Sequence, residues 1–273
     1  MPPDWLNAEP TIRLSAFAGV LLVLMIAEAL FPRRRRLLTR RRRWTSNLLL
    51  AAINTGVARL AAPLSAVAAA LWAEKQGFGA LQWISMPESL RILLAVLALD
   101  LVIYAQHVVF HYVPLFWRLH RVHHADRDFD VTTGVRFHTV EILLSLLIKL
   151  AAVLLLGAPA LAVLIFEVVL NATSMFSHSN LRLPQWLDQA LRLVLVTPDM
   201  HRVHHSMIRS ETNSNFGFNV PWWDRLFRTY IAQPAKGHDD MDIGLANIAE
   251  RDSVRLDRVL LLPLAADKAD SND

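Results

Sequence analysis

The stretch VEILLSLLIKLAAVLLLGAPALAVLIFEVVLNATSMF, residues 140–176, decides the fold class of this chain. It contains two apolar runs, 140–156 and 160–176, with Gly157 and Pro159 between them. Each run approaches the roughly 20 residues that a helix needs to cross a hydrocarbon core, and Gly and Pro stand where a turn belongs. The stretch therefore predicts a membrane-spanning helical hairpin.

Three further apolar runs precede the hairpin, at roughly 12–31, 45–72 and 90–111, and Pro63 interrupts the second. Of the 273 residues, 54% are hydrophobic, and the mean hydropathy of +0.32 is higher than a soluble domain normally has. We expect an all-α integral membrane bundle of about three spans plus the hairpin. The segment 1–89 would hold the first spans and a basic loop, 90–230 the core, and 231–273 a C-terminal cytoplasmic tail with a loose acidic end.

Eight arginines lie in the short loop between the first two spans, at 33–36 and 40–43. Basic residues in short loops stay in the cytoplasm, which fixes the direction of every later span. This pattern favours contact with anionic headgroups over binding of nucleic acid, and we expect no nucleic-acid partner. The histidine-rich ends of the later spans then form a cap on the cytoplasmic face, in a membrane that we expect to be a bacterial inner membrane.

Ten of the eleven histidines fall between positions 107 and 205, mostly in three clusters, HVVFH, LHRVHH and MHRVHH. Two histidines four residues apart share one helix face, whereas the adjacent pair of HxxHH points in two directions. One such segment can serve two metals, or one metal and its surroundings. Because the chain has no cysteine, only histidine and carboxylate remain as strong ligands. The pattern predicts a multi-histidine site for two metals, and its candidates are His107, His111, His120, His123, His124, His138, His178, His201, His204 and His205.

Carboxylates should offset the charge of the metals and orient the imidazoles. Glu141 is the preferred candidate because it follows His138 by three residues. The other acidic candidates are Asp126, Asp128, Asp130, Asp199 and Asp224. Asn215 and Asp224 are expected either to position their loop or to accept hydrogen bonds from ligand imidazoles.

An aromatic stretch at 216–223 and the segment 184–196 are expected to cover the site at the membrane interface. QWLDQALRLVLV, residues 185–196, is typical of an amphipathic helix that lies in the interface plane. Phe216, Trp222 and Trp223 are the candidate contacts with substrate, although the two tryptophans also suit an interfacial aromatic belt.

In order, HVVFH, WRLHRVHHAD, VRFHTVE, SHSN, HRVHHS and NSNFGFNVPWWDRLFRTY occupy about residues 90–230. This series resembles the fatty acid hydroxylase and sterol desaturase superfamily of membrane oxygenases. The resemblance implies a non-haem diiron centre held by the ten histidines, with His138 as a ligand or its close neighbour. It also implies O2 as cosubstrate, hydroxylation or desaturation of a sterol-like or fatty-acyl membrane lipid, and electrons from a separate carrier protein.

Three residues depart from the family pattern. Thr139 replaces a proline, Ser174 replaces a histidine that lipid-hydroxylase relatives often have, and Arg228 replaces a glycine. The second departure favours the sterol-desaturase-like branch and makes His138 a stronger candidate ligand.

The sequence leaves other classes of protein open. A metal transporter would place its ligands near the middle of the bilayer, and a haem protein would need only one or two axial histidines. A non-catalytic or zinc-binding membrane protein is a further alternative. The residues leave the lipid, the outcome of the reaction, the electron donor and the oligomeric state open.

Overall fold

The computed structural model describes residues 4–61 and 65–265, and every regular element within them is helical. The all-α prediction is therefore confirmed, whereas the expected break at Pro63 lies outside the described residues. The α-helices are α1 (Asp4–Leu30), α2 (Arg40–Ala61), α3 (Ala66–Gln76), α4 (Glu88–Tyr112), α5 (Pro114–His124), α6 (Thr139–Leu156), α7 (Ala160–Ser177), α8 (Gln185–Leu191), α9 (Pro198–His204), α10 (Arg209–Thr212), α11 (Trp222–Leu226), α12 (Gly237–Asp240), α13 (Glu250–Val254) and α14 (Leu256–Leu261). Three short 3-10 helices are η1 (Ala80–Gln82), η2 (Thr133–Val135) and η3 (Leu262–Leu264).

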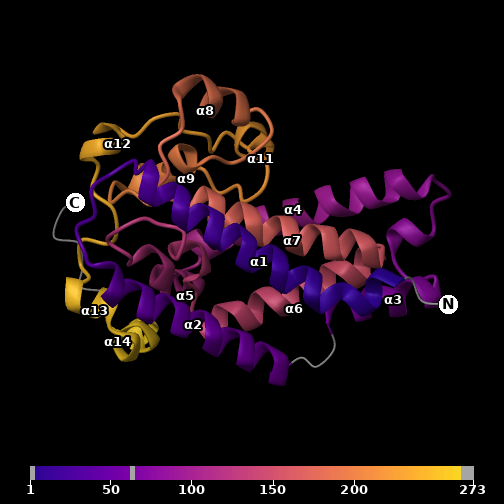
Figure 1. The fold of residues 1–273 in the computed structure, drawn as a ribbon. Coiled ribbons are helices and arrows are strands. Elements are labelled where there is room, and N and C mark those ends of the chain that lie inside the picture. The colour runs from indigo at the N-terminus through magenta and orange to yellow at the C-terminus, as the bar shows by residue number, and fades with distance from the viewer. Residues whose placement is uncertain (1–3, 62–64, 266–273) are drawn as a thin grey trace.

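Five helical stretches are long and apolar enough to cross a membrane: α1, α2 together with α3, α4, α6 and α7. They coincide with the apolar runs of the sequence and lie roughly along one direction (Figure 1). α7 packs against α1, α3 and α4, while α6 packs against α2, α3 and α4. Half of the apolar window of α7 is buried, but only 11% of that of α1. The outer helices therefore present an apolar surface that suits lipid.

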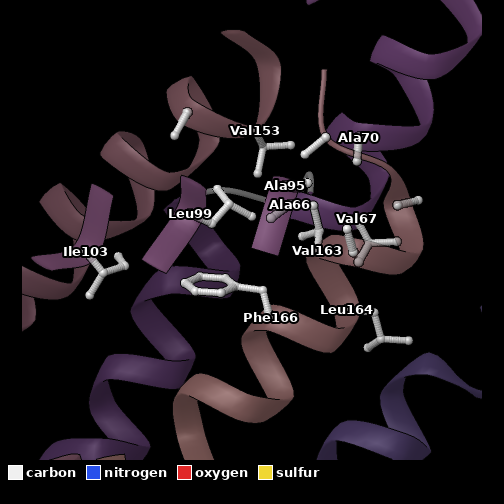
Figure 2. Packing of buried hydrophobic residues seen from close by; sticks show 14 residues of the cluster. Ala66, Val67, Ala70, Ala95, Leu99, Ile103, Val153, Val163, Leu164 and Phe166 are labelled. Carbon is white, nitrogen blue, oxygen red and sulfur yellow. The ribbon is translucent and has the colours of Figure 1, made fainter. Parts of the chain in front are cut away.

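The core of the bundle lies where α3, α4, α6 and α7 meet (Figure 2). Leu99, Val153 and Phe166 pack there against small residues of α3, among them Ala66 and Ala70. Since lipid tails are as apolar as these side chains, association within a membrane depends on close packing, which alanine permits. The alanine-rich sequence of α3 thus lets it lie close to the hairpin.

Glycine is required in the turn of the hairpin and in the segment between α3 and η1 that packs against it. Gly157 ends α6 with a φ of 62°, and Gly79 approaches it with a φ of 105°. A Cβ atom on Gly79 would lie 2.2 Å from the backbone nitrogen of Gly157. Only glycine combines this close approach with positive φ without strain.

Short helices gather at the other end of the bundle, where the loop between α1 and α2 also lies (Figure 1). α13 and α14 pack against α2, and η3 packs against α5. The C-terminal segment is therefore part of the fold as far as residue 265, and the predicted loose acidic end lies outside the described residues. The expected in-plane helix is shorter than predicted, because α8 ends at Leu191 and the chain continues in turns.

Candidate metal centre

The first group of histidines gathers at the end of α4. Its five members each place one ring nitrogen within 4.8 Å of the others, and all five side chains are buried. α4 contributes two of them from one face, because residues four apart lie one turn above each other on a helix. The members are His107, His111, His120, His124 and His204.

The second group of histidines lies beside the first, where α7 ends. His178 is the C-cap residue of α7, and His205 is the C-cap residue of α9. His123 of α5 and His201 of α9 complete a buried set of four, again with ring nitrogens within 4.8 Å of one another.

The two HxxHH segments contribute to both groups in opposite senses. In LHRVHH the first and last histidines join the first group, and His123 joins the second. In MHRVHH the first and last join the second group, and His204 joins the first. Adjacent residues on a helix point about 100° apart. The two adjacent histidines of each segment therefore reach different groups, and each segment contributes to both groups.

Backbone carbonyls fix the protonation of four rings. Each of these rings has its Nδ1 close to a carbonyl oxygen, which can only accept a hydrogen bond, so Nδ1 carries the hydrogen. In a neutral ring Nε2 then presents a lone pair. The four Nδ1–carbonyl pairs are His107 with Phe216 at 2.7 Å, His123 with Arg136 at 3.1 Å, His178 with Ser174 at 2.7 Å, and His204 with Ser214 at 2.7 Å.

The Nε2 atoms approach one another too closely for neutral rings without a cation. His178 Nε2 lies 3.0 Å from that of His123, and the His107–His120 distance is 3.1 Å; in both pairs Nδ1 of each ring already donates to an oxygen. Lone pairs that face each other repel. Two nitrogens that bind the same ion, each at about 2.1 Å, can lie this close together because both lone pairs point at the ion and not at each other. The spacing therefore fits nitrogens that share a metal ion.

Buried nitrogens without partners support the same conclusion. Nε2 of His111, His124 and His204, and both ring nitrogens of His205, have no hydrogen-bond partner among residues 4–61 and 65–265. Such atoms cost free energy unless something binds them. A metal ion in each group would bind one nitrogen of each of these rings, so the residues present fit a pair of metals.

Burial keeps the imidazoles neutral, which is the form that binds metal. Removal from water lowers the pKa of His123, His124 and His201 well below the usual value, and neighbouring imidazoles lower it further. Burial also lowers the pKa of His178 to about 4. At neutral pH these rings are therefore neutral and able to bind metal.

Glu141 contacts the first group directly. Its buried Oε1 accepts a hydrogen bond from Nδ1 of His120 at 2.7 Å. The position that sequence reasoning preferred for a charge-balancing carboxylate is therefore close to a cluster histidine, although the contact is with His120 and not with nearby His138. Its effect on a bound metal stays a prediction.

Asn213 is a polar side chain at the site that sequence reasoning missed. Asn213 lies 3.2 Å from Nδ1 of His111 through its Oδ1. An asparagine in a polar loop carries no signal of such a role, and only the close approach of the loop to α4 places it there.

His138 lies outside both histidine groups. It forms the N-cap of α6, where its Nδ1 accepts a hydrogen bond from the amide of Val140 at 3.2 Å. Its Nε2 lies 3.2 Å from the carbonyl of Leu260. Both nitrogens have partners, so the geometry does not favour His138 as a ligand.

The other predicted acidic and amide residues act on the loops. Asp199 pairs with Arg202 and with Arg33. Asn215, at a φ of 49°, donates to the carbonyls of Met200 and Ile231.

Asp224 accepts hydrogen bonds from the amides of Phe216 and Gly217, each at 2.8 Å. Of the two roles considered for Asn215 and Asp224, these contacts favour positioning of the loop. The carbonyl of Phe216 that holds His107 belongs to this loop.

The predicted aromatic cover is divided between the interior and the surface. Phe216 is fully buried, and its ring centroid lies 5.1 Å from that of His111. Trp223 donates to Asp100 of α4 at 2.8 Å, and Trp222 donates to the carbonyl of Leu193 beside α8. The tryptophans thus attach the cover to α4 and α8, and 42% of Trp222 stays exposed.

The acidic residues that follow the second histidine cluster hold the arginine loop. Arg43 is fully buried and forms ion pairs with Asp126 at 2.7 Å and with Asp130 at 2.5 Å. Asp128 accepts from the amides of Leu37 and Leu38. The arginines and the histidines therefore lie at the same end of the bundle.

Two departures from the family pattern have local explanations. Arg228 has a φ of 60°, the left-handed region in which the usual glycine is free of strain. Thr139 is the first residue of α6, a position that also suits proline, and it donates to Asn54 at 2.7 Å.

Comparison with known proteins adds an independent assignment. The family model described as fatty acid hydroxylase matches residues 92–229. An ornithine lipid hydroxylase of Rhizobium tropici is 30% identical over 163 residues, which are 59% of this chain and 47% of that protein. Cholesterol 25-hydroxylase of Rattus norvegicus is 30% identical over 145 residues, 52% of this chain and 47% of that protein. Human alkylglycerol monooxygenase is 27% identical over 149 residues, 52% of this chain and 31% of that protein.

The matched segment spans less than half the length of each of these relatives. No solved structure matches the chain at a significant level. The family match nevertheless covers half of the chain and includes all nine histidines of the two groups. The resemblance found in the motifs is confirmed, and the chain belongs to the fatty acid hydroxylase family.

Proposed function

We propose that the two histidine groups hold two iron ions and that the chain hydroxylates a C–H bond of a membrane lipid with O2. The observation that carries this proposal is the pair of buried groups, five and four imidazoles, whose free nitrogens converge. In the balanced reaction one oxygen atom of O2 is inserted into the C–H bond of the lipid to give an alcohol. The other leaves as water, with two electrons and two protons from a separate carrier protein.

The ligand set supports iron over structural zinc. Structural zinc is satisfied by four ligands and is often bound by thiolates, whereas this centre offers nine imidazoles from a chain without cysteine. Iron bound there would supply the activation of O2. The three relatives described above are named as hydroxylases or a monooxygenase of lipids, which favours hydroxylation over desaturation.

The residues around the groups would orient the rings and exclude water. Carbonyls of the 214–216 loop hold two imidazoles, and the ring of Phe216 covers the first group. Phe218 lies against His107 with a centroid distance of 4.9 Å. An apolar lining next to neutral ligands suits a hydrocarbon substrate better than a polar one.

A lipid would reach this lining from the side. The family and the long apolar helices make the chain an integral membrane protein. Trp186 and Leu193 near α8, and Leu226 and Phe227 near α11, are between 53% and 70% exposed. These side chains suit insertion into the interface beside the site. The arginine loop at the same end favours a cytoplasmic active site, in agreement with the basic-residue rule for a bacterial inner membrane.

Metal analysis of the full chain, purified without oxygen, tests the centre. We expect about two irons per chain. One zinc per chain, or no metal, would contradict the proposal. His123→Ala should lower the iron content, whereas His238→Ala, a buried histidine outside both groups, serves as the matched control.

Comparative lipid mass spectrometry of cells with and without the gene tests the reaction. Gain of one oxygen atom in one lipid class is expected, and loss of two hydrogens would indicate desaturation instead. If cells that carry His123→Ala show the wild-type lipids, the chain is a non-catalytic membrane protein.

A further inference from the structure

A pocket of about 440 Å³ lies where α1 ends and the arginine loop begins. At about 30 Å³ for each water molecule, it has room for roughly fifteen waters, or for a small headgroup. Its lining contains six arginines and a single carboxylate. The lining residues are Glu28, Ala29, Pro32, Arg33, Arg34, Arg35, Arg36, Arg40 and Arg182.

Two of these guanidinium groups have donors without acceptors, although Nη2 of Arg34 donates to the carbonyl of Met241 at 2.7 Å. Nη1 of Arg34 and both Nε and Nη2 of Arg40 are buried without a hydrogen-bond partner in the part of the chain that the structure describes. The guanidinium of Arg40 instead lies 4.8 Å from the ring centroid of Trp44. A buried charged donor without an acceptor raises the free energy of the folded chain. An anion in the pocket would supply acceptors, so the lining favours an anionic ligand.

Carboxylates of the protein offset only part of this charge. Arg33 is paired with Asp199 at 3.3 Å and with Asp239 at 2.5 Å. Glu28 is fully buried, and its Oε1 accepts from the amides of Val131 and Asn180. Glu28 therefore accepts hydrogen bonds from backbone amides and not from the arginines of the pocket. The six arginines of the lining outnumber its single carboxylate.

The surroundings of the pocket favour an anion that carries acyl chains. Leu22, Ile26 and Leu30 are 58%, 52% and 65% exposed, and their spacing of four places them in one stripe along α1. Ala29 continues this face and lines the pocket. A headgroup in the pocket would leave its chain along an exposed apolar stripe.

The pocket is also fixed to the fold near the second histidine group. The amide of Arg33 donates to the carbonyl of Asn180 at 2.8 Å, and Pro32 forms an isolated bridge with Leu181. Asn180 follows His178 by two residues. These contacts hold the arginine loop at the same end of the bundle as the histidines. If that end faces the cytoplasm, anionic headgroups concentrate beside it.

We propose that this pocket binds the phosphate headgroup of an anionic membrane phospholipid, with the acyl chain along α1. Guanidinium groups bind phosphate through paired hydrogen bonds, which provides both charge and geometry. The site is separate from the histidine groups and does not depend on the reaction proposed for them.

Thermal unfolding of the purified full chain in neutral detergent measures this binding, because a ligand of the folded state raises the midpoint with concentration. The probes are dioleoylphosphatidylglycerol, dioleoylphosphatidylcholine and inorganic phosphate. We expect saturable stabilisation by phosphatidylglycerol and little by the other two. Equal stabilisation by inorganic phosphate would overturn the lipid proposal, and equal stabilisation by phosphatidylcholine would overturn recognition of the anion.

The double variant Arg34→Gln with Arg40→Gln should weaken phosphatidylglycerol binding at least about tenfold, the size of effect expected from losing hydrogen bonds to charged groups. The matched control is Arg41→Gln with Arg42→Gln, since these arginines carry the same charge but are exposed and outside the pocket. Equal weakening in both would mean nonspecific attraction and would overturn the proposal.

A second variant keeps the test independent of charge. Ala29→Trp fills the pocket from an exposed position and leaves all arginines in place. It should weaken phosphatidylglycerol binding while the unfolding midpoint without lipid stays close to that of the parent. Unchanged binding in Ala29→Trp would place the lipid elsewhere.

Discussion

Arg43→Met should destabilise the chain strongly, because it removes the cation from a fully buried ion-pair network. Arg43 binds both oxygens of Asp126 at 2.7 Å and one oxygen of Asp130 at 2.5 Å. The side chains of all three residues are at most 1% exposed. Removing one partner from such a network leaves uncompensated buried charge and typically costs about 3–5 kcal/mol.

The expected shift of the unfolding midpoint follows from this magnitude. For a chain of this size about 2–4 °C is lost per kcal/mol, so Arg43→Met should lower the midpoint by about 6–20 °C. The assay is thermal unfolding in detergent, followed by tryptophan fluorescence. Arg41→Met is the control, since Arg41 is the exposed arginine two residues earlier. If both variants lose the same few degrees, the network does not stabilise the fold as argued.

The same network predicts the response to acid. Burial alone would raise the pKa of Asp126, but the guanidinium of Arg43 overrides it and lowers the pKa to about 2. The folded pKa lies below the ordinary value near 3.8, so the unfolded chain takes up the proton first. This contribution, about 2 kcal/mol, is present above pH 4 and is lost as the pH falls from about 4 to about 2. In Arg43→Met this acid-dependent part should disappear.

Three further predictions concern the site and its loop. Glu141→Gln should weaken metal affinity about 10- to 100-fold, because it removes the negative charge of the group that accepts a hydrogen bond from His120. Competition with a chelator measures the affinity, and an unchanged value would exclude a role for the carboxylate. His178→Ala should lower the metal content, whereas His138→Ala should keep it, because only His178 belongs to a histidine group; equal losses by elemental analysis would make His138 a ligand after all. Arg228→Gly should stabilise the chain by about 1 kcal/mol, since it relieves a φ of 60°, and a lower unfolding midpoint would contradict that explanation.

Much of the candidate metal centre could be predicted because its information is local. Histidines three and four residues apart have a fixed angular relation once the segment is helical, so the division of HxxHH between two directions follows from spacing alone. The apolar runs likewise identify the long helices, because length and composition suffice for that purpose. The motif series then identified the family, which the family match confirmed.

The backbone partners of the imidazoles could not be predicted, because they depend on contacts between distant segments. Backbone carbonyls of Phe216 and Ser214 hold two of the rings, and a carbonyl is the same for every residue type. The acidic residues near the second cluster looked equally suited to balance metal charge. Asp126 instead binds Arg43, which lies 83 residues earlier, and no local pattern distinguishes that use.

The placement of the histidines also explains why adjacent pairs are needed. Adjacent residues on a helix point in different directions, so an adjacent pair of histidines can reach two neighbouring groups from one short helix. Each HxxHH segment contributes two histidines to one group and one histidine to the other. Because the two segments bridge in opposite senses, α5 and α9 fix the relative position of both groups. α5 and α9 therefore contribute directly to the distance between the groups.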